Sequence, residues 1–377
     1  MNARSIILAC LLLAVVSACT TQDVVQPAAV RVRKNVKNLT AQEKADFVSA
    51  LKKLKTVPSP YDPAINYYDQ FVKWHYLAFR CDPADAHLHG YPAHMGPAFL
   101  PWHRVYLDMF EQALSSVSGK NITVPYWDWT DDGSTAAVFS DDFMGGTGDP
   151  AEGYAVMTGP LRKGEFVVSF TDVDDVDSIF ADVNTDPNPV TYLTRAMGMF
   201  PGGWQPALPT ATDVQTTLNV AVYDAAPWDC TPDTTKSFRN SLEGWRGKSG
   251  NFCDSATKNM DARADGSGLR SKMHNVVHIY VGGIFPADNP AGAAAGSMAQ
   301  NTSPNDPVFW IHHANIDRIW AAWMKRHGRS YLPINGGPMG HNLNDVMEPF
   351  SFRTDGKNTP ASVLNESSLN FEYDALP

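Results

Sequence analysis

Basic residues are outnumbered in this sequence of 377 residues, with 30 lysines and arginines against 40 aspartates and glutamates. The resulting net charge of −10 provides no basic surface, so we expect no nucleic-acid partner. Beyond the N-terminal segment, no apolar run approaches the roughly 18 residues of a membrane-spanning helix. Repeats of solenoid period are also absent. Hydrophobic residues nevertheless make up 44% of the chain, which excludes a disordered or fibrous protein.

The N-terminal residues 1–19 are typical of an export signal. Arg4 provides the positive charge, and residues 6–16 form an apolar run that is too short to span a bilayer. The last four residues, VSAC, resemble the end of a bacterial lipoprotein signal, in which Cys19 becomes the lipidated first residue. Ordinary cleavage after Ala18 is the alternative.

An export signal at the N-terminus implies that the chain has a signal peptide, a linker and a mature domain. We expect a signal peptide over residues 1–18, a polar linker over 19–32 and one domain over 33–377. Lipidation of Cys19 would tether this domain to a membrane, in the periplasm or the cell envelope.

Few cysteines are available for disulfides. Of the five in the sequence, Cys10 leaves with the signal peptide and Cys19 would carry lipid. Cys81, Cys230 and Cys253 remain in an oxidising compartment, where disulfides persist. Cys230 and Cys253 flank a polar stretch and could pair, but sequence alone does not establish the bond.

Hydrophobic residues recur at helical spacing in five segments. In the first, Thr40 is placed to cap the helix and Glu43 follows at the spacing of a capping box. In the last, Asp306 and Pro307 suit the helix start. The expected helices cover residues 40–56, residues 65–79, the segment that follows Pro101, residues 269–280 and residues 305–327.

The region 131–190 differs in composition, with thirteen acidic residues against two basic ones. Its content of glycine, proline and aspartate predicts loops on the surface. The motif DVDDVD at 172–177 lacks the glycine and the terminal glutamate of an EF-hand loop. We therefore interpret it as solvated acidic surface rather than a calcium site.

Seven of the eleven histidines lie in a helix-like context near aromatic residues. They are His75, His94, His103, His274, His278, His312 and His313. His274 and His278 are four residues apart, so both project from one helix face and could bind one metal ion. His94 and His103 are separated by two prolines, which predicts one imidazole on a loop and the other on a helix. A single pair of this kind is weak evidence, because packing in the core explains any one histidine equally well.

The chemistry of imidazole narrows the choice of metal to copper, zinc, iron or nickel. A catalytic zinc site typically uses about three protein ligands, often with a carboxylate, and the sequence contains no H-E-x-x-H motif. Two clusters made only of histidines instead favour a metal pair that reacts with dioxygen.

Three long motifs closely resemble the copper-binding signatures of bacterial tyrosinases and related polyphenol oxidases, the type-3 copper proteins. They are AHMGPAFLPWHR (93–104), MHNVVHIYVGG (273–283) and DPVFWIHHANIDRIW (306–320). Further segments that look like this family are residues 33–55, VPYWDWT (124–130), FRNSLEGW (238–245) and GHNLNDVMEPF (340–350). The resemblance implies a mainly α fold, with a four-helix bundle that holds a dinuclear copper centre, long surface loops and few short strands.

The resemblance also implies which histidines bind the two copper ions. The ligands would be His75, His94 and His103 for the first copper, and His274, His278 and His313 for the second. His87 and His89 compete with His94, which the PAHM context favours. A helical wheel does not distinguish His312 from His313; in the family the second histidine of such a pair is the ligand.

Two further residues are implied to act in catalysis. In tyrosinases a glutamate–asparagine pair orders a water that deprotonates monophenols, and Glu243 and Asn275 match these positions. A carboxylate near metal cations can accept a proton through water. The simpler readings are a helix cap for Glu243 and a surface amide for Asn275. The long insertion between Glu243 and His274 departs from the compact bacterial pattern.

The activity implied by the resemblance is copper-dependent oxidation of phenols by O2. It comprises o-hydroxylation of monophenols and oxidation of o-diphenols to o-quinones, with a small phenol and O2 as substrates. A catechol oxidase or an o-aminophenol oxidase without monophenolase activity is the alternative within this class. A haemocyanin-like dioxygen-binding protein is the alternative of a different class. A copper chaperone is a further partner to consider.

Overall fold

The computed structural model describes residues 30–79, 91–169, 190–200, 205–230, 233–244, 272–286 and 295–377. Eight α-helices and a single pair of three-residue strands lie within these ranges. The expectation of a mainly α fold with few short strands is therefore confirmed. Among the described helices, none has the length and apolar character needed to cross a membrane.

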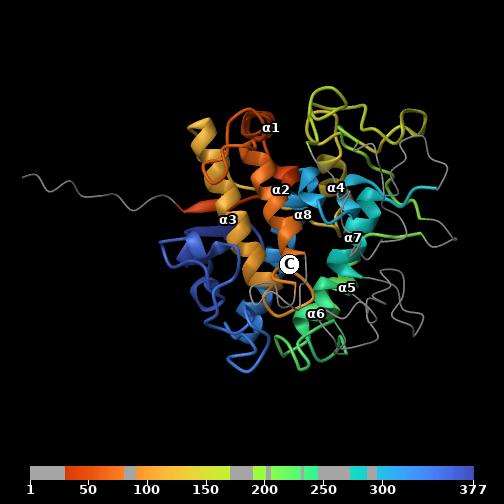
Figure 1. Ribbon diagram of the computed structural model, residues 1–377. Coiled ribbons are helices and arrows are strands. Elements are labelled where there is room, and N and C mark those ends of the chain that lie inside the picture. The colour runs from red at the N-terminus through yellow and green to blue at the C-terminus, as the bar shows by residue number, and fades with distance from the viewer. Residues whose placement is uncertain are drawn as a thin grey trace, which may run out of the picture.

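Four helices lie together at the centre of the molecule (Figure 1). They are α2 (Tyr67–Ala78), α3 (Phe99–Ser118), α7 (Met273–Gly282) and α8 (Val308–His327). The rings of Phe110 and Trp310 stack between α3 and α8 with centroids 3.5 Å apart. Trp310 also donates a 3.2 Å hydrogen bond to the hydroxyl of Tyr68 on α2. Buried aromatic side chains thus join three helices of the expected bundle.

The bounds of these helices differ slightly from the expected ones. α3 begins at Phe99, so that Pro101 lies in its first turn, where proline is tolerated. α8 begins at Val308 instead of residue 305. Pro307 occupies the N-cap position that the sequence predicts for Asp306, and the Asp306 carboxylate, one residue earlier, still accepts a 3.0 Å hydrogen bond from the Val308 amide.

The helix α1 (Ala41–Leu54) packs against α3. It begins with the expected capping box, in which Thr40 and Glu43 each accept a hydrogen bond from the other's backbone amide. Phe47, Leu51 and Leu54 are buried on its inner face.

The strands β1 (Arg31–Arg33) and β2 (Phe371–Tyr373) pair in parallel. The expected linker includes Arg31 and Val32, but the structure places both in β1, which corrects the boundary. The reason is that the arginines of β1 neutralise buried carboxylates of the bundle.

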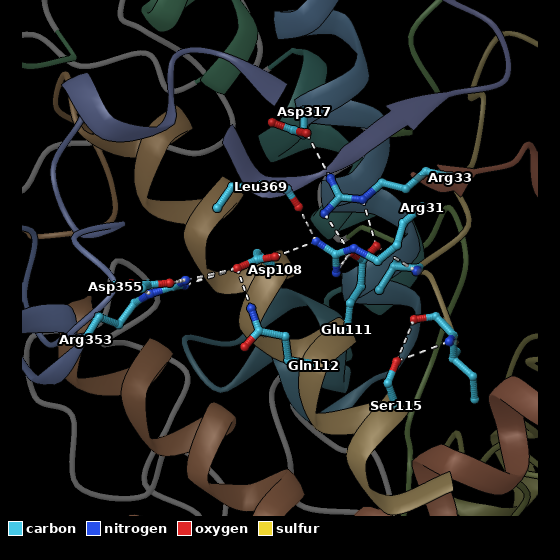
Figure 2. A network of polar contacts seen from close by, with 12 residues as sticks. Arg31, Arg33, Asp108, Glu111, Gln112, Ser115, Asp317, Arg353, Asp355 and Leu369 are labelled. Carbon is cyan, nitrogen blue, oxygen red and sulfur yellow. Dashed lines mark hydrogen bonds and ion pairs between the residues drawn. The ribbon is translucent and has the colours of Figure 1, made fainter. Parts of the chain in front are cut away.

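Figure 2 shows these contacts. The Arg33 guanidinium lies 2.7 Å from Glu111 of α3 and 2.9 Å from Asp317 of α8. Arg31 lies 2.6 Å from Asp108 and 2.8 Å from Glu111. Arg33 and Glu111 are wholly buried, and a buried carboxylate is costly unless it is paired. β1 is therefore an integral part of the bundle.

Loops make up most of the described residues of the region 131–190, as its composition predicts. The short helices α4 (Asp132–Val138), α5 (Ala211–Leu218) and α6 (Phe238–Glu243) lie between α3 and α7. The motif at 172–177 lies outside the described residues. Single 3-10 turns occur at Val36–Asn38, Pro150–Glu152, Ser297–Ala299, Ser303–Asn305, Phe350–Phe352, Ala361–Val363 and Glu366–Leu369.

Candidate metal centre

The first histidine cluster joins α2, α3 and the loop that precedes α3. His75 lies on α2, His94 on the loop and His103 on α3, and one ring nitrogen of each lies within 4.8 Å of the others. All three side chains are buried. The structure therefore brings together the three residues that we predicted for the first copper.

Backbone carbonyls orient two rings of this cluster. The Nδ1 of His75 lies 2.7 Å from the carbonyl oxygen of Asn301, and the Nδ1 of His103 lies 2.8 Å from that of Phe99. A carbonyl only accepts, so Nδ1 carries the proton and Nε2 keeps its lone pair. Both Nε2 atoms are buried and have no hydrogen-bond partner among the described residues. This is the arrangement expected of a metal-binding histidine.

The second cluster lies between α7 and α8 and contains His274, His278, His312 and His313. The Nε2 of His278 lies 3.0 Å from that of His274 and 3.4 Å from that of His313. The Nδ1 atoms of His274 and His278 face the carbonyl oxygens of Glu243 and Met298, at 3.2 and 2.7 Å. Because each ring carries its proton on Nδ1, the lone pairs of the two Nε2 atoms face each other at 3.0 Å. A cation bound by both atoms would relieve this repulsion.

The short distance between His313 and His278 agrees with the prediction of His313 as the third ligand, and His312 belongs to the same cluster. The ring of His312 instead stacks on that of His274, with centroids 5.2 Å apart and an angle of 16°, and contacts Trp129. His312 is wholly buried. Neither nitrogen of its ring has a hydrogen-bond partner among the described residues, and the ring lies 4.9 Å from that of His278, so the choice between His312 and His313 stays a prediction.

The two clusters lie against each other. The rings of His103 and His313 stack with centroids 4.2 Å apart, and those of His94 and His274 lie 6.3 Å apart. One cluster on α2 and α3 thus faces the other on α7 and α8, and their separation suits a dinuclear copper centre.

Burial keeps these imidazoles neutral. It lowers the pKa of His75 to about 3 and that of His278 to about 4, and the pKa values of the other cluster histidines are also well below the usual range. A neutral ring is the form that binds a metal. At neutral pH the centre can therefore accept copper without first losing protons.

A pocket opens beside both clusters. Its apolar lining includes Phe79, Ile279 and Met298, and Asn275 contributes an amide from α7. His75, His94, His274 and His278 also line it. Asn275 therefore lines the pocket next to a predicted ligand and is buried, so it is not a surface amide, and its catalytic role stays a prediction.

Glu243 is not among the residues that line the pocket. Its carboxylate accepts a hydrogen bond from the Met95 amide and pairs with Arg239 at 3.0 Å. Met95 has a φ of 55°, in the left-handed region, and directly follows His94. Burial raises the pKa of the Glu243 carboxyl to about 7, against the opposing effect of Arg239. Glu243 thus supports the loop that carries His94.

Several predicted features remain untested by the described residues. His87, His89, Cys81 and Cys253 lie outside them, so the competition for the second ligand place and the Cys230–Cys253 disulfide stay predictions. Cys230 is buried just before α6.

Sequence reasoning missed two features of the site. One is the segment that supplies the carbonyls of Met298 and Asn301, because every residue has a carbonyl and no side-chain pattern marks these two. The other is the ion pair of Arg239 with Glu243, which the four-residue spacing within FRNSLEGW could have indicated.

Comparison with known proteins identifies the same family that the sequence motifs resemble. Residues 65–326 match the common central domain of tyrosinase. A tyrosinase from Streptomyces antibioticus is 37% identical over 340 residues, which cover 89% of this chain and 97% of that protein. The grixazone synthase of Streptomyces griseus is 34% identical over 358 residues, covering 92% and 99%.

Solved structures share the fold at lower identity. A polyphenol oxidase from Thermothelomyces thermophila has a TM-score of 0.57 and 22% identity, covering 92% of this chain and 89% of that one. A functional unit of octopus hemocyanin has a TM-score of 0.50 and 19% identity, covering 92% and 68%. Because the matching domain and the bacterial relatives span most of the sequence, the chain belongs to the tyrosinase family of type-3 copper proteins.

Proposed function

We propose that this protein oxidises phenols with O2 at two copper ions, one held by each histidine cluster. The observation that carries this proposal is the facing arrangement of the two buried clusters beside an open pocket, in a chain of the tyrosinase family. The ligands would be His75, His94 and His103 at one copper, and His274, His278 and His313 at the other. Bound copper supplies the activation of O2 and the transfer of electrons.

The pocket binds and orients the phenol. Phe79, Ile279 and Met298 offer apolar surface for an aromatic ring, and the amides of Asn275 and Gln300 provide the few polar groups. Small-molecule sites commonly combine these features. The ring would lie against the apolar wall with its hydroxyl toward the imidazoles.

For monophenols we propose that Asn275 and Glu243 remove the hydroxyl proton. Asn275 would hold a water in the pocket, and a carboxylate oxygen of Glu243 would take the proton through that water. Burial places the pKa of Glu243 at about 7, near the value that suits a general base at neutral pH.

The enclosure of Glu243 favours a second candidate, oxidation of o-diphenols alone. One carboxylate oxygen already accepts from Met95 and the other pairs with Arg239. A carboxylate so engaged would serve mainly to position the His94 loop. The protein would then act as a catechol oxidase or an o-aminophenol oxidase.

Oxygen uptake by the copper-loaded protein separates these functions. Uptake with both tyrosine and a catechol, lost in His278→Ala, supports the proposal. If Glu243 is the base, Glu243→Gln lowers turnover of tyrosine by about 10²-fold or more and that of the catechol only slightly. Equal loss with both substrates supports the positioning role. No uptake by a protein holding two coppers would favour a haemocyanin-like dioxygen-binding protein.

We further propose that the protein is exported and tethered in the periplasm or cell envelope through lipidated Cys19. The support is the signal-like sequence of residues 1–19. Metabolic labelling with a fatty acid checks this: label should enter the natural chain and be absent from Cys19→Ser. A soluble, unlabelled natural chain would favour ordinary cleavage after Ala18. A copper chaperone stays a proposed partner.

A further inference from the structure

We propose that Thr194 and Ser297 are positioning residues that hold one short segment, 297–301, against both histidine clusters, so that the two copper half-sites depend on the same support. This inference rests on the copper-binding part of the proposed function and not on the choice of substrate. Thr194 belongs to the loop 190–200, and Ser297 opens the 3-10 turn Ser297–Ala299.

The segment supplies one carbonyl to each half-site. The carbonyl oxygen of Met298 lies 2.7 Å from the Nδ1 of His278, and that of Asn301 lies 2.7 Å from the Nδ1 of His75. These bonds orient one ligand of each cluster and leave its Nε2 toward the metal. A shift of the segment would therefore misalign a ligand on both sides at once.

Thr194 and Ser297 clamp the start of this segment. The Ser297 amide donates to the carbonyl oxygen of Thr194 at 2.9 Å and to its hydroxyl at 3.2 Å. The Thr194 amide donates to the Ser297 hydroxyl at 3.1 Å, and the two hydroxyls lie 3.3 Å apart. Both residues are buried, so water does not replace a lost bond readily.

The loop that carries Thr194 is itself firmly anchored. The next residue, Arg195, forms a buried ion pair with Asp306 at the start of α8. The Ala196 amide donates a 2.8 Å hydrogen bond to the carbonyl oxygen of Gly282, at the end of α7. The clamp therefore transmits the positions of α7 and α8 to the segment.

The start of the segment packs backbone to backbone against the end of α7. A Cβ on Gly282 would lie 2.6 Å from the Ala299 nitrogen, and one on Gly296 would lie 2.1 Å from the Gly282 carbonyl oxygen. Backbone thus touches backbone where α7 meets the turn. Loss of a clamp bond cannot be absorbed locally and should reach Met298 and Asn301.

The test measures Cu(I) affinity of each half-site by competition with a chelator. His313→Ala leaves the first cluster complete, and His103→Ala leaves the second complete. In each background Ser297→Ala removes the hydroxyl that accepts from the Thr194 amide. The matched control is Ser134→Ala, because the buried Ser134 hydroxyl likewise accepts a 3.0 Å hydrogen bond from a backbone amide, that of Asp128.

We expect Ser297→Ala to weaken Cu(I) binding roughly tenfold in both backgrounds, the lower end of the effect of removing a partner of a metal ligand. Ser134→Ala should leave both affinities within about twofold of the parent. A loss confined to one of the two backgrounds, or a loss in neither, overturns the inference.

A second pair of variants tests the clamp independently, in case Ser297→Ala does not fold. Thr194→Val keeps the shape of the side chain and removes its hydroxyl, whereas Thr194→Ser keeps the hydroxyl. Weaker copper binding at both half-sites in Thr194→Val, restored in Thr194→Ser, supports the clamp; equal affinity of the two variants overturns it. If the parent proteins bind no copper, the metal centre and this inference both fail. If they bind copper and the clamp variants match them, only the inference fails.

Discussion

Arg195 holds Asp306 through two hydrogen bonds, of 2.6 Å from Nε and 2.8 Å from Nη2, with both side chains wholly buried. The same guanidinium donates to the carbonyl oxygens of Met144 and Gly145. It thereby joins the loop after α4, the loop 190–200 and the start of α8 at one point.

We predict that Arg195→Met lowers the free energy of unfolding by about 3–5 kcal/mol, because it leaves the Asp306 carboxylate buried without its partner. Urea denaturation measures the change. Lys120→Met is the control, because Lys120 pairs with Asp46 on the surface and its side chain is 53% exposed; we expect less than about 1 kcal/mol there. Equal changes in the two variants would contradict the importance of burial.

The second prediction concerns the two adjacent histidines of α8. Because the Nε2 of His313 lies 3.4 Å from that of His278, we propose His313 as the ligand, and His313→Ala should lower the bound copper from two ions per chain to one. His312→Ala should keep two ions and lose stability through its lost packing against His274 and Trp129. Elemental analysis after dialysis counts the copper, and the reverse result would assign the ligand to His312.

The third prediction is that the metal-free protein is sensitive to acid. Burial lowers the pKa of His278 to about 4 and that of His75 to about 3 in the folded chain. An unfolded histidine has a pKa near 6.5, so the unfolded state binds more protons below that pH. Stability is therefore complete above pH 6.5 and is lost as the pH falls toward 4, on the order of 3 kcal/mol for His278 alone.

Urea denaturation of the metal-free protein between pH 7.5 and pH 4.5 tests this dependence. In His278→Gln the slope should be smaller, since glutamine does not titrate. Unchanged slopes would show that other groups cause the acid sensitivity.

The fourth prediction concerns the contact of α7 with the turn at Ala299. Gly282→Ala places a Cβ 2.6 Å from the Ala299 nitrogen and 2.7 Å from its Cβ, so backbone must shift. We expect a loss of about 1–3 kcal/mol, typical of overpacking. Gly146→Ala is the matched control, because the nearest atom would lie 3.9 Å away. Thermal unfolding compares the two, and similar stabilities would mean that the turn yields easily.

The helices and the candidate metal-binding histidines can be predicted from the sequence because the patterns that mark them lie within a few residues of one another. Thr40 and Glu43 mark the start of α1 within four residues, and the spacing of His274 and His278 already places both on one face of α7. The motifs that contain the histidines are long enough to identify the family. Each of these inferences depends on neighbours along the chain.

The remaining features depend on residues that are far apart in the sequence. The choice between His312 and His313 depends on how α8 faces α7, which neither helix specifies alone. The clamp between Thr194 and Ser297 joins residues 103 positions apart, and ordinary hydroxyl residues give no sign of such a contact. The place of Arg31 in the domain is hidden in the sequence, because its carboxylate partners, Asp108 and Glu111, lie on a helix that is far along the chain.

The parallel pairing of β1 with β2 places the first and last strands of the described chain side by side, with Arg31 opposite Phe371 and Arg33 opposite Tyr373. If the two strands were joined, the backbone would form a ring. A connection from Tyr373 back to Arg31 need only run the length of a three-residue strand, about 7 Å. In a ring the starting point is arbitrary. A circularly permuted chain, opened instead within an exposed acidic loop, would still contain every contact between α2, α3, α7 and α8, so the order of synthesis can be changed while the histidine centre is kept.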